Sequence, residues 1–184
     1  MTSDQRTEGQ GTGNRLGRLD GLLTSISRLV ALLGMFGLAG AMFATVVDVA
    51  LRPTGTGIFG VVDLVQLGVM AAAWLAIPYA FLTDSHVSVD LLAQGLPRRM
   101  SALLNALAAG LAAGLMALIL VYGWQAAAQQ ARFGDVSQTL ALPKTWYWAP
   151  LLFGAALSLL ATLLIAVRSL LSALSVAGQG RGGP

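Results

Sequence analysis

The sequence predicts an all-α membrane protein, with four antiparallel transmembrane helices and one or two amphipathic helices at the membrane surface. Of its 184 residues, 56% are hydrophobic and only 10% are charged, whereas soluble domains carry about 25% charged residues. The mean hydropathy is +0.74. The charges are also unevenly spread, because four long stretches contain none. Together these observations exclude an ordinary soluble enzyme domain, a disordered chain and a coiled coil.

Each of the four charge-free stretches is long enough for a membrane-spanning helix, for which about 18 apolar residues suffice. The stretches cover residues 29–47, 64–83, 100–131 and 145–167, which is 19, 20, 32 and 23 residues. We therefore expect helices near 29–51, 62–83, 100–128 and 145–171. The third helix is longer than one crossing requires, so we expect it to tilt or to extend past the membrane.

The segments that flank these helices have two kinds of composition. Residues 15–27 and 84–96 carry apolar side chains at helical spacing, and we expect both segments to lie on the membrane surface. Residues 1–14 and 176–184 are polar and rich in glycine, and we expect disordered tails there. The predicted membrane domain therefore spans residues 15–175.

The distribution of Lys and Arg predicts the orientation. Eight of these residues lie on the side that would hold both termini and the loop between the second and third helices, and three lie on the other side. Because positively charged loops stay in the cytoplasm, we expect both termini to be cytoplasmic. Trp124, Trp146, Tyr147 and Trp148 fall on the opposite side, where they would form an aromatic belt.

The residue inventory disfavours chemistry within the membrane. The chain has no cysteine and one histidine, His86, which excludes thiolate metal sites and a bis-histidine haem site. The charged residues lie at or beyond the ends of the four apolar stretches. Transport sites in membranes usually have a charged residue near mid-depth. We expect no enzymatic activity, no cofactor, no metal and no substrate site in this chain. Nucleic acid is not an expected partner, because the sequence lacks a basic cluster interleaved with aromatic residues.

Five titratable residues near the helix ends, two pairs and one single carboxylate, are candidates for structural roles or for partner contacts. Asp48 and Arg52 are four residues apart and are expected to pair at the end of the first helix. Asp63 opens the second helix, where a carboxylate favours the positive end of the helix dipole. His86 and Asp90 are also four apart; we favour a structural pair there over a pH switch or half of a metal site.

Small residues recur at four-residue spacing on the predicted helices, and such rows allow helix backbones to approach closely in lipid. The helix-packing candidates are Gly68 and Ala72 on the second helix, Gly110 and Gly114 on the third, and Gly154 and Ser158 on the fourth. The spacing leaves open whether the neighbouring helix belongs to this chain or to another.

The order of several landmarks resembles one transporter family. The landmarks are Arg52, Asp63, His86 and Asp90 within residues 86–92, Pro97 with two following arginines, and residues 140–150. In this order they resemble the small membrane subunit, called DctQ-like, of tripartite ATP-independent periplasmic (TRAP) transporters. The resemblance covers roughly residues 29–165. That family often has a glutamate where this chain has Asp63.

The resemblance implies a small permease subunit of a secondary carboxylate uptake transporter in the bacterial inner membrane. A large permease subunit would hold the substrate and sodium sites, and a periplasmic solute-binding protein would deliver the solute. The small subunit would brace the large one and help to dock the binding protein. Under this interpretation Arg52, Asp63, His86, Asp90 and Pro97 serve structure or subunit contact.

Two other functions fit the same sequence pattern. One is the small subunit of a tripartite tricarboxylate transporter, which also has about four helices. The other is an autonomous homo-oligomeric carrier, in which the rows of small residues would form contacts between copies. An intramembrane enzyme or redox subunit is disfavoured by the lone histidine and the missing cysteine.

Overall fold

The structure is a computed structural model that describes residues 4–84 and 98–179, and it consists of long helices. The helices are α1 (Asp4–Leu51), a short 3₁₀ helix η1 (Arg52–Thr54), α2 (Val61–Asp84), α4 (Arg98–Phe133) and α5 (Thr145–Gln179). Each of the four α-helices contains a segment long and apolar enough to cross a membrane. The predicted all-α membrane fold with four transmembrane helices is therefore confirmed.

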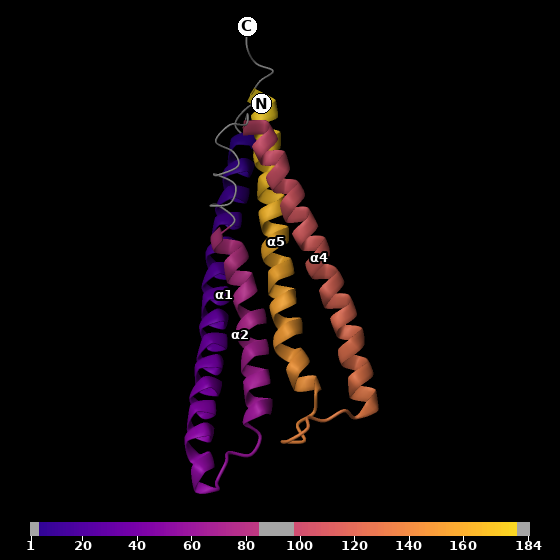
Figure 1. Ribbon diagram of the computed structural model, residues 1–184. Coiled ribbons are helices and arrows are strands. Elements are labelled where there is room, and N and C mark those ends of the chain that lie inside the picture. The colour runs from indigo at the N-terminus through magenta and orange to yellow at the C-terminus, as the bar shows by residue number, and fades with distance from the viewer. Residues whose placement is uncertain (1–3, 85–97, 180–184) are drawn as a thin grey trace.

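The helices begin and end where the backbone chemistry requires it. Pro53 lacks an N–H and ends the regular helical hydrogen bonding after Leu51. Gly134 follows Phe133 with φ +67°, and its N–H donates to the Ala131 carbonyl at 3.4 Å. A left-handed glycine at this position commonly ends a helix, because no Cβ opposes that conformation. The resulting connections bring the two inter-helix loops, residues 52–60 and 134–144, to one end of the molecule (Figure 1).

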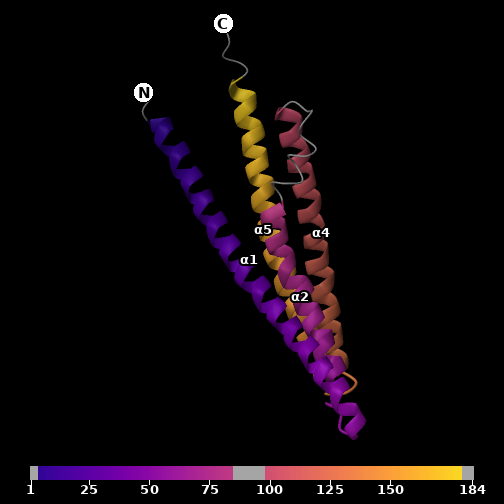
Figure 2. The same ribbon diagram turned by 60° about the vertical axis from the view of Figure 1, so that its left-hand side comes forward.

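We call this the loop end, and the opposite end, which holds both chain termini, the terminal end. The helices form an open row in the order α1, α2, α5, α4 (Figure 1). In this row α5 packs against both α2 and α4, whereas α1 packs mainly against α2. Toward the terminal end α1 diverges from α5 (Figure 2). The edge helices α1 and α4 therefore each have only one extensive neighbour within the described residues.

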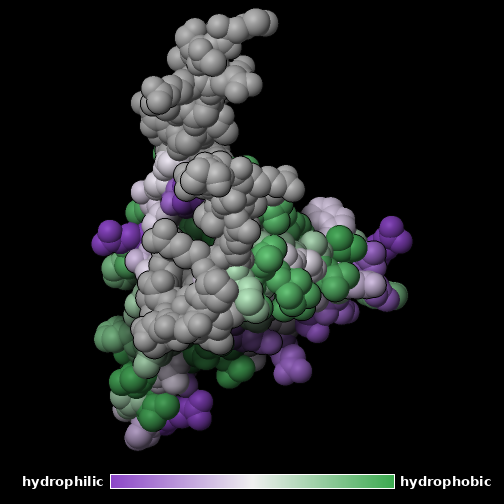
Figure 3. Space-filling view, turned by 90° about the horizontal axis from the view of Figure 1, so that it is seen from above, coloured by the Kyte–Doolittle hydropathy of each residue, from purple (hydrophilic) through white to green (hydrophobic). Residues whose placement is uncertain are grey.

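Most of the large apolar side chains on these helices are exposed. Seen from the terminal end, hydrophobic side chains lie on the outside of the described helices (Figure 3). Of the residues in each spanning window, 33% are buried in α5 but only 17% in α1 and in α4. In water this surface would be unstable, but in a bilayer it faces lipid or a partner subunit.

Small residues lie at the closest approaches between helices. A Cβ added at Gly68 would lie 3.0 Å from the Cβ of Ala41, and one added at Gly34 would lie 3.1 Å from the Cα of Ala72. These contacts form the seam between α1 and α2. Gly154 on α5 lies so close to α2 that an added Cβ would collide with the Trp74 carbonyl oxygen.

Ser158 lies one turn further along α5 and is fully buried. Its hydroxyl has no hydrogen-bond partner in the described part of the chain. The position therefore depends on the small size of the side chain rather than on a hydrogen bond.

The third-helix candidates have a different environment. Gly110 and Gly114 on α4 are exposed, and an added Cβ at either position would meet nothing within 4 Å. We call these two glycines the α4 row. Within this chain the α4 row packs against no other described helix. A role for these two glycines in helix packing stays a prediction about a neighbouring chain.

The chain termini differ from the sequence-based expectation. Residues 15–27 are part of the uninterrupted helix α1, which begins at Asp4 and so includes most of the expected N-terminal tail. The apolar spacing of residues 15–27 continues in phase into the first spanning stretch, and the first proline in the chain is Pro53. No break is therefore required. Helix α5 likewise runs to Gln179. The expected interfacial segment 84–96 lies, apart from Asp84, outside the described residues.

We predict that Gly154→Ala destabilises the protein by about 1–3 kcal/mol, because the new methyl group must push α5 away from the α2 backbone. Thermal unfolding in detergent, followed by size-exclusion chromatography, measures the effect. The control is Gly110→Ala, which enters open space and gains helix propensity of up to about 1 kcal/mol. Equal stability of the two variants would contradict the close α2–α5 contact.

Candidate functional site

The candidate site is the loop end, where two buried carboxylates organise the two inter-helix loops. Asp48 lies in the last turn of α1 and Asp63 in the first turn of α2. Only 5% of Asp48 and 3% of Asp63 is exposed. A buried carboxylate is costly unless it is paired or accepts hydrogen bonds, so the partners of each one determine what it does.

Asp48 orders the first loop. Its Oδ2 accepts hydrogen bonds from Arg52 Nη2 at 3.0 Å and Nε at 3.2 Å, so the expected i, i+4 pair is present. Its Oδ1 accepts a hydrogen bond from the Ile58 backbone N–H at 2.7 Å. The Arg52 side chain is 69% exposed, and an ion pair of that kind contributes little to stability. The bond to Ile58, which closes a ten-residue span, is the contact that shapes the loop.

Asp63 lies in the first turn of α2, as expected, and its side chain also holds the second loop. Its Oδ2 accepts hydrogen bonds from Ser137 Oγ at 2.8 Å, Thr139 N–H at 3.2 Å, Thr139 Oγ1 at 2.5 Å and Leu140 N–H at 2.7 Å. A favourable interaction of this carboxylate with the dipole of α2 stays a prediction. A carboxylate has enough lone pairs to accept hydrogen bonds from several donors. Here the donors belong to residues that follow Asp63 in the sequence by 74 to 77 positions.

The second loop also has hydrogen bonds of its own. The Ser137 N–H donates to the Leu142 carbonyl at 2.8 Å, and the Lys144 N–H donates to the Asp135 carbonyl at 3.0 Å. The Leu142 N–H donates to Ser137 Oγ at 3.1 Å. The loop is therefore a closed turn in which many of the backbone N–H groups are paired, as suits a segment at a membrane boundary.

The two loops also contact each other. Gly60, in the first loop, has φ +85° and lies under the side chain of Leu140, so that an added Cβ would collide with it. Tyr147, near the start of α5, is 9% exposed and donates its hydroxyl to the Asp63 carbonyl at 3.3 Å. Tyr147 is thus buried within the loop end, not on the outer surface where an aromatic belt would place it.

Several large apolar side chains are exposed at the loop end, among polar neighbours. We use the name loop-end surface for Ile58, Phe59, Phe133, Val136 and Trp146, whose exposed fractions run from 37% to 75%. Phe59, at 75%, is the most exposed. These residues lie in or next to the two loops that Asp48 and Asp63 order.

Three of the candidate site residues lie outside the described part of the chain: His86, Asp90 and Pro97. Among the described residues, no group of three or more His, Asp or Glu side chains could hold a metal ion. The described part of the candidate site therefore consists of hydrogen-bonded loop contacts and exposed side chains.

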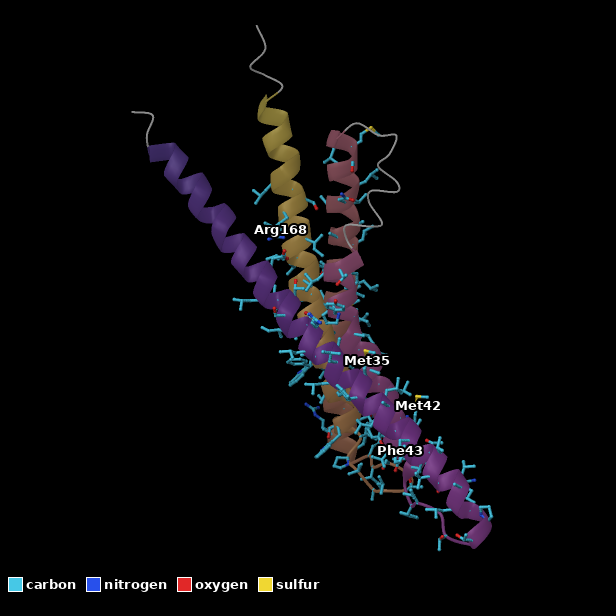
Figure 4. All side chains as sticks on the ribbon, turned by 90° about the vertical axis from the view of Figure 1, so that its left-hand side faces the viewer. Met35, Met42, Phe43 and Arg168 are labelled. Carbon is cyan, nitrogen blue, oxygen red and sulfur yellow. The ribbon has the colours of Figure 1, made fainter. Side chains whose placement is uncertain are left out.

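A second ion pair joins α1 to α5 toward the terminal end. Arg168 Nη1 lies 2.6 Å from Asp20 Oδ2, and each side chain is about one-third exposed. Arg168 reaches from α5 toward α1 (Figure 4). The sequence analysis missed this pair because its members are 148 positions apart. The only sequence signal was one acid and one base near the ends of different predicted helices.

Residues 41–172 match the family model for the DctQ component of tripartite ATP-independent periplasmic transporters. The match begins within α1 and includes both loops and most of α5. The chain belongs to the DctQ family. The predicted resemblance is thereby confirmed, and this DctQ protein is the small permease component of a TRAP transporter. No curated protein and no solved structure gave a significant match.

We predict that Asp63→Asn destabilises this DctQ protein by about 1–3 kcal/mol, because charge-assisted hydrogen bonds to the second loop become neutral ones. Asp63→Ala should cost more, since it leaves the donors of Ser137, Thr139 and Leu140 unpaired. Thermal unfolding measures both effects, and limited proteolysis reports on residues 134–144. The matched control is Asp135→Asn in the same loop, which should change stability by less than about 0.5 kcal/mol. An Asp63→Asn variant as stable as that control would contradict this role of Asp63.

Proposed function

We propose that this chain braces the large permease subunit of a TRAP-type carboxylate uptake transporter and helps to dock the periplasmic solute-binding protein. Its own helices would hold no substrate site. In this proposal it lies in the bacterial inner membrane with both termini in the cytoplasm, as the Lys and Arg counts indicate. The observation that carries the docking role is the loop-end surface, which is apolar, exposed and held by Asp48 and Asp63.

Docking at the loop end follows from its rigidity and composition. Binding is weakened when loops must be ordered at the interface, and the hydrogen bonds of Asp48 and Asp63 order both loops in advance. Aromatic side chains are common anchors of protein interfaces. Phe59 and Trp146 supply such anchors on the side that the charge distribution places in the periplasm.

Bracing is supported by the open row of helices. The edge helices α1 and α4 present long apolar faces that no other described helix of the chain covers. On α1 the exposed side chains include Met35, Met42 and Phe43 (Figure 4). On α4, Gly110 and Gly114 lie in open space, where another helix can approach the backbone closely. We propose that the α4 row is the contact with the large permease subunit.

The positions of the described charged residues support the proposal that this chain has no substrate site of its own. Asp48, Arg52, Asp63 and Lys144 are at the loop end, whereas Asp20 and Arg168 pair toward the terminal end. Substrate sites of membrane transporters usually combine polar groups and broken helices at mid-depth. The four described spans are continuous helices. The solute-handling groups would therefore belong to the large subunit.

We expect Phe59→Ala to weaken binding of the solute-binding protein to the assembled transporter by tenfold or more, as loss of an aromatic interface anchor does. Surface plasmon resonance with the transporter in nanodiscs measures this affinity. Phe43→Ala is the matched control. Phe43 is similarly exposed, at 72%, but it lies within the spanning helix α1 and not in a loop. If both variants bind the solute-binding protein as the wild type does, Phe59 is not part of the docking surface.

We expect Gly114→Leu to reduce the amount of large permease subunit that co-purifies with this chain by severalfold, because the larger side chain blocks close helix approach. The fold of the chain itself should be unchanged, since nothing lies within 4 Å of the new Cβ. The control is Gly40→Leu, an equally open position on α1. Undiminished co-purification of Gly114→Leu would remove α4 as the bracing helix.

A further inference from the structure

A cavity of about 380 Å³ opens at the loop end beside the second loop. Its walls come from α2, from the last turn of α4, from the second loop and from the first turn of α5. Helices α2 and α4 make no extensive contact in the described structure, and α5 packs against both. The cavity thus lies in the gap between α2 and α4, with Tyr147 and Trp148 of α5 lining it.

Several polar groups in the cavity wall are hydrogen-bond donors without a partner among the described residues. Gln130 accepts the indole N–H of Trp148 on its Oε1 at 2.7 Å. Because indole can only donate, this bond fixes the orientation of the Gln130 amide and leaves its NH₂ available. Lys144 is half-buried and forms no ion pair with any described residue. Gln66 supplies another amide on the α2 side.

The one acid in the wall, Asp63, already has its partners in the second loop. Asp63 is 3% exposed, and four hydrogen bonds from the second loop converge on its Oδ2. Those donors stabilise the negative charge on the loop side of the carboxylate. The ammonium group of Lys144 and the amides of Gln66 and Gln130 are therefore the groups that determine what the cavity attracts. Together they suit an oxyanion.

The depth of the cavity indicates where the oxyanion comes from. Both α2 and α5 begin their spans here, so the donors lie at the boundary of the apolar segments. Val62 and Met70 line the same cavity, and their separation of eight positions corresponds to about 12 Å along α2. A wall that combines polar donors with apolar side chains suits the two parts of a lipid, and Lys and aromatic residues are typical of the headgroup level.

We propose that this cavity binds a phospholipid, with the headgroup phosphate at Lys144 and Gln130 and an acyl chain along Val62 and Met70. The lipid would fill the gap between α2 and α4, where the described helices make no extensive contact. It acts as a structural ligand of the helix row. Lys144 and Gln130, which would hold the phosphate, belong neither to the loop-end surface nor to the α4 row, so the inference can fail without affecting the proposed function.

The test is native mass spectrometry of the delipidated full-length chain titrated with phosphatidylglycerol. We expect one lipid adduct that saturates at a 1:1 ratio. Lys144→Gln should weaken this adduct at least fivefold, because the cation is lost. Gln130→Glu should weaken it comparably: the side chain still accepts the Trp148 N–H, but a carboxylate replaces the donor that faces the phosphate. The matched control is Arg132→Gln, which removes a cation at the same end from a different cavity and should leave binding within twofold of the wild type.

Two further ligands separate the sources of the interaction. Diacylglycerol with the same acyl chains has no phosphate and should bind at least fivefold more weakly than phosphatidylglycerol. Glycerol 3-phosphate carries the phosphate alone and should bind far more weakly still. Full lipid occupancy in both Lys144→Gln and Gln130→Glu, or equal binding of diacylglycerol, would overturn phosphate recognition. Equal affinity for glycerol 3-phosphate would assign the cavity to a soluble oxyanion and overturn the lipid proposal.

Discussion

The convergence of four hydrogen bonds on one oxygen of Asp63 is the interaction on which the loop end depends. It ties the start of α2 to a loop that joins α4 to α5, and so connects the two halves of the chain. Because the carboxylate is nearly inaccessible to solvent, its charge is stabilised by these donors and not by water. The contact between Gly60 and Leu140 and the bond from Tyr147 both lie next to this network. The exposed aromatic side chains are held in place as a consequence.

The open row of helices is the second determinant of how this DctQ protein works. A closed four-helix bundle buries the apolar faces of all its members, whereas here only the inner helices α2 and α5 have extensive neighbours on two sides among the described residues. The large exposed apolar surface of α1 and α4 is stable only in lipid or against another subunit. The architecture therefore agrees with a component of a larger membrane assembly. It also leaves a gap between α2 and α4 at the loop end, which the polar cavity occupies.

The sequence was sufficient to predict the four spans and the family, because a charge-free stretch of about 20 residues has few alternatives to a transmembrane helix. It was also sufficient for the Asp48–Arg52 pair, whose spacing is local. It could not predict the partners of Asp63 or the Asp20–Arg168 pair, since both depend on how distant helices are placed. The rows of small residues show the same limit. Gly68 and Gly110 sit in similar rows, but only Gly68 faces a helix of this chain, because spacing defines a stripe and not its rotation toward a neighbour.

The central position of α5 has a consequence for how the family can vary over evolution. Its buried face carries Gly154, Ala155, Ser158, Ala161 and Thr162, and neighbours on both sides leave no room for larger side chains. The outward faces of α1 and α4 are bounded only by lipid or by a subunit that can change along with them. Relatives that serve different transporters should therefore diverge on the edge helices and retain small residues along α5. Substitutions are therefore expected to accumulate first on the outward faces of α1 and α4 and last on the buried face of α5.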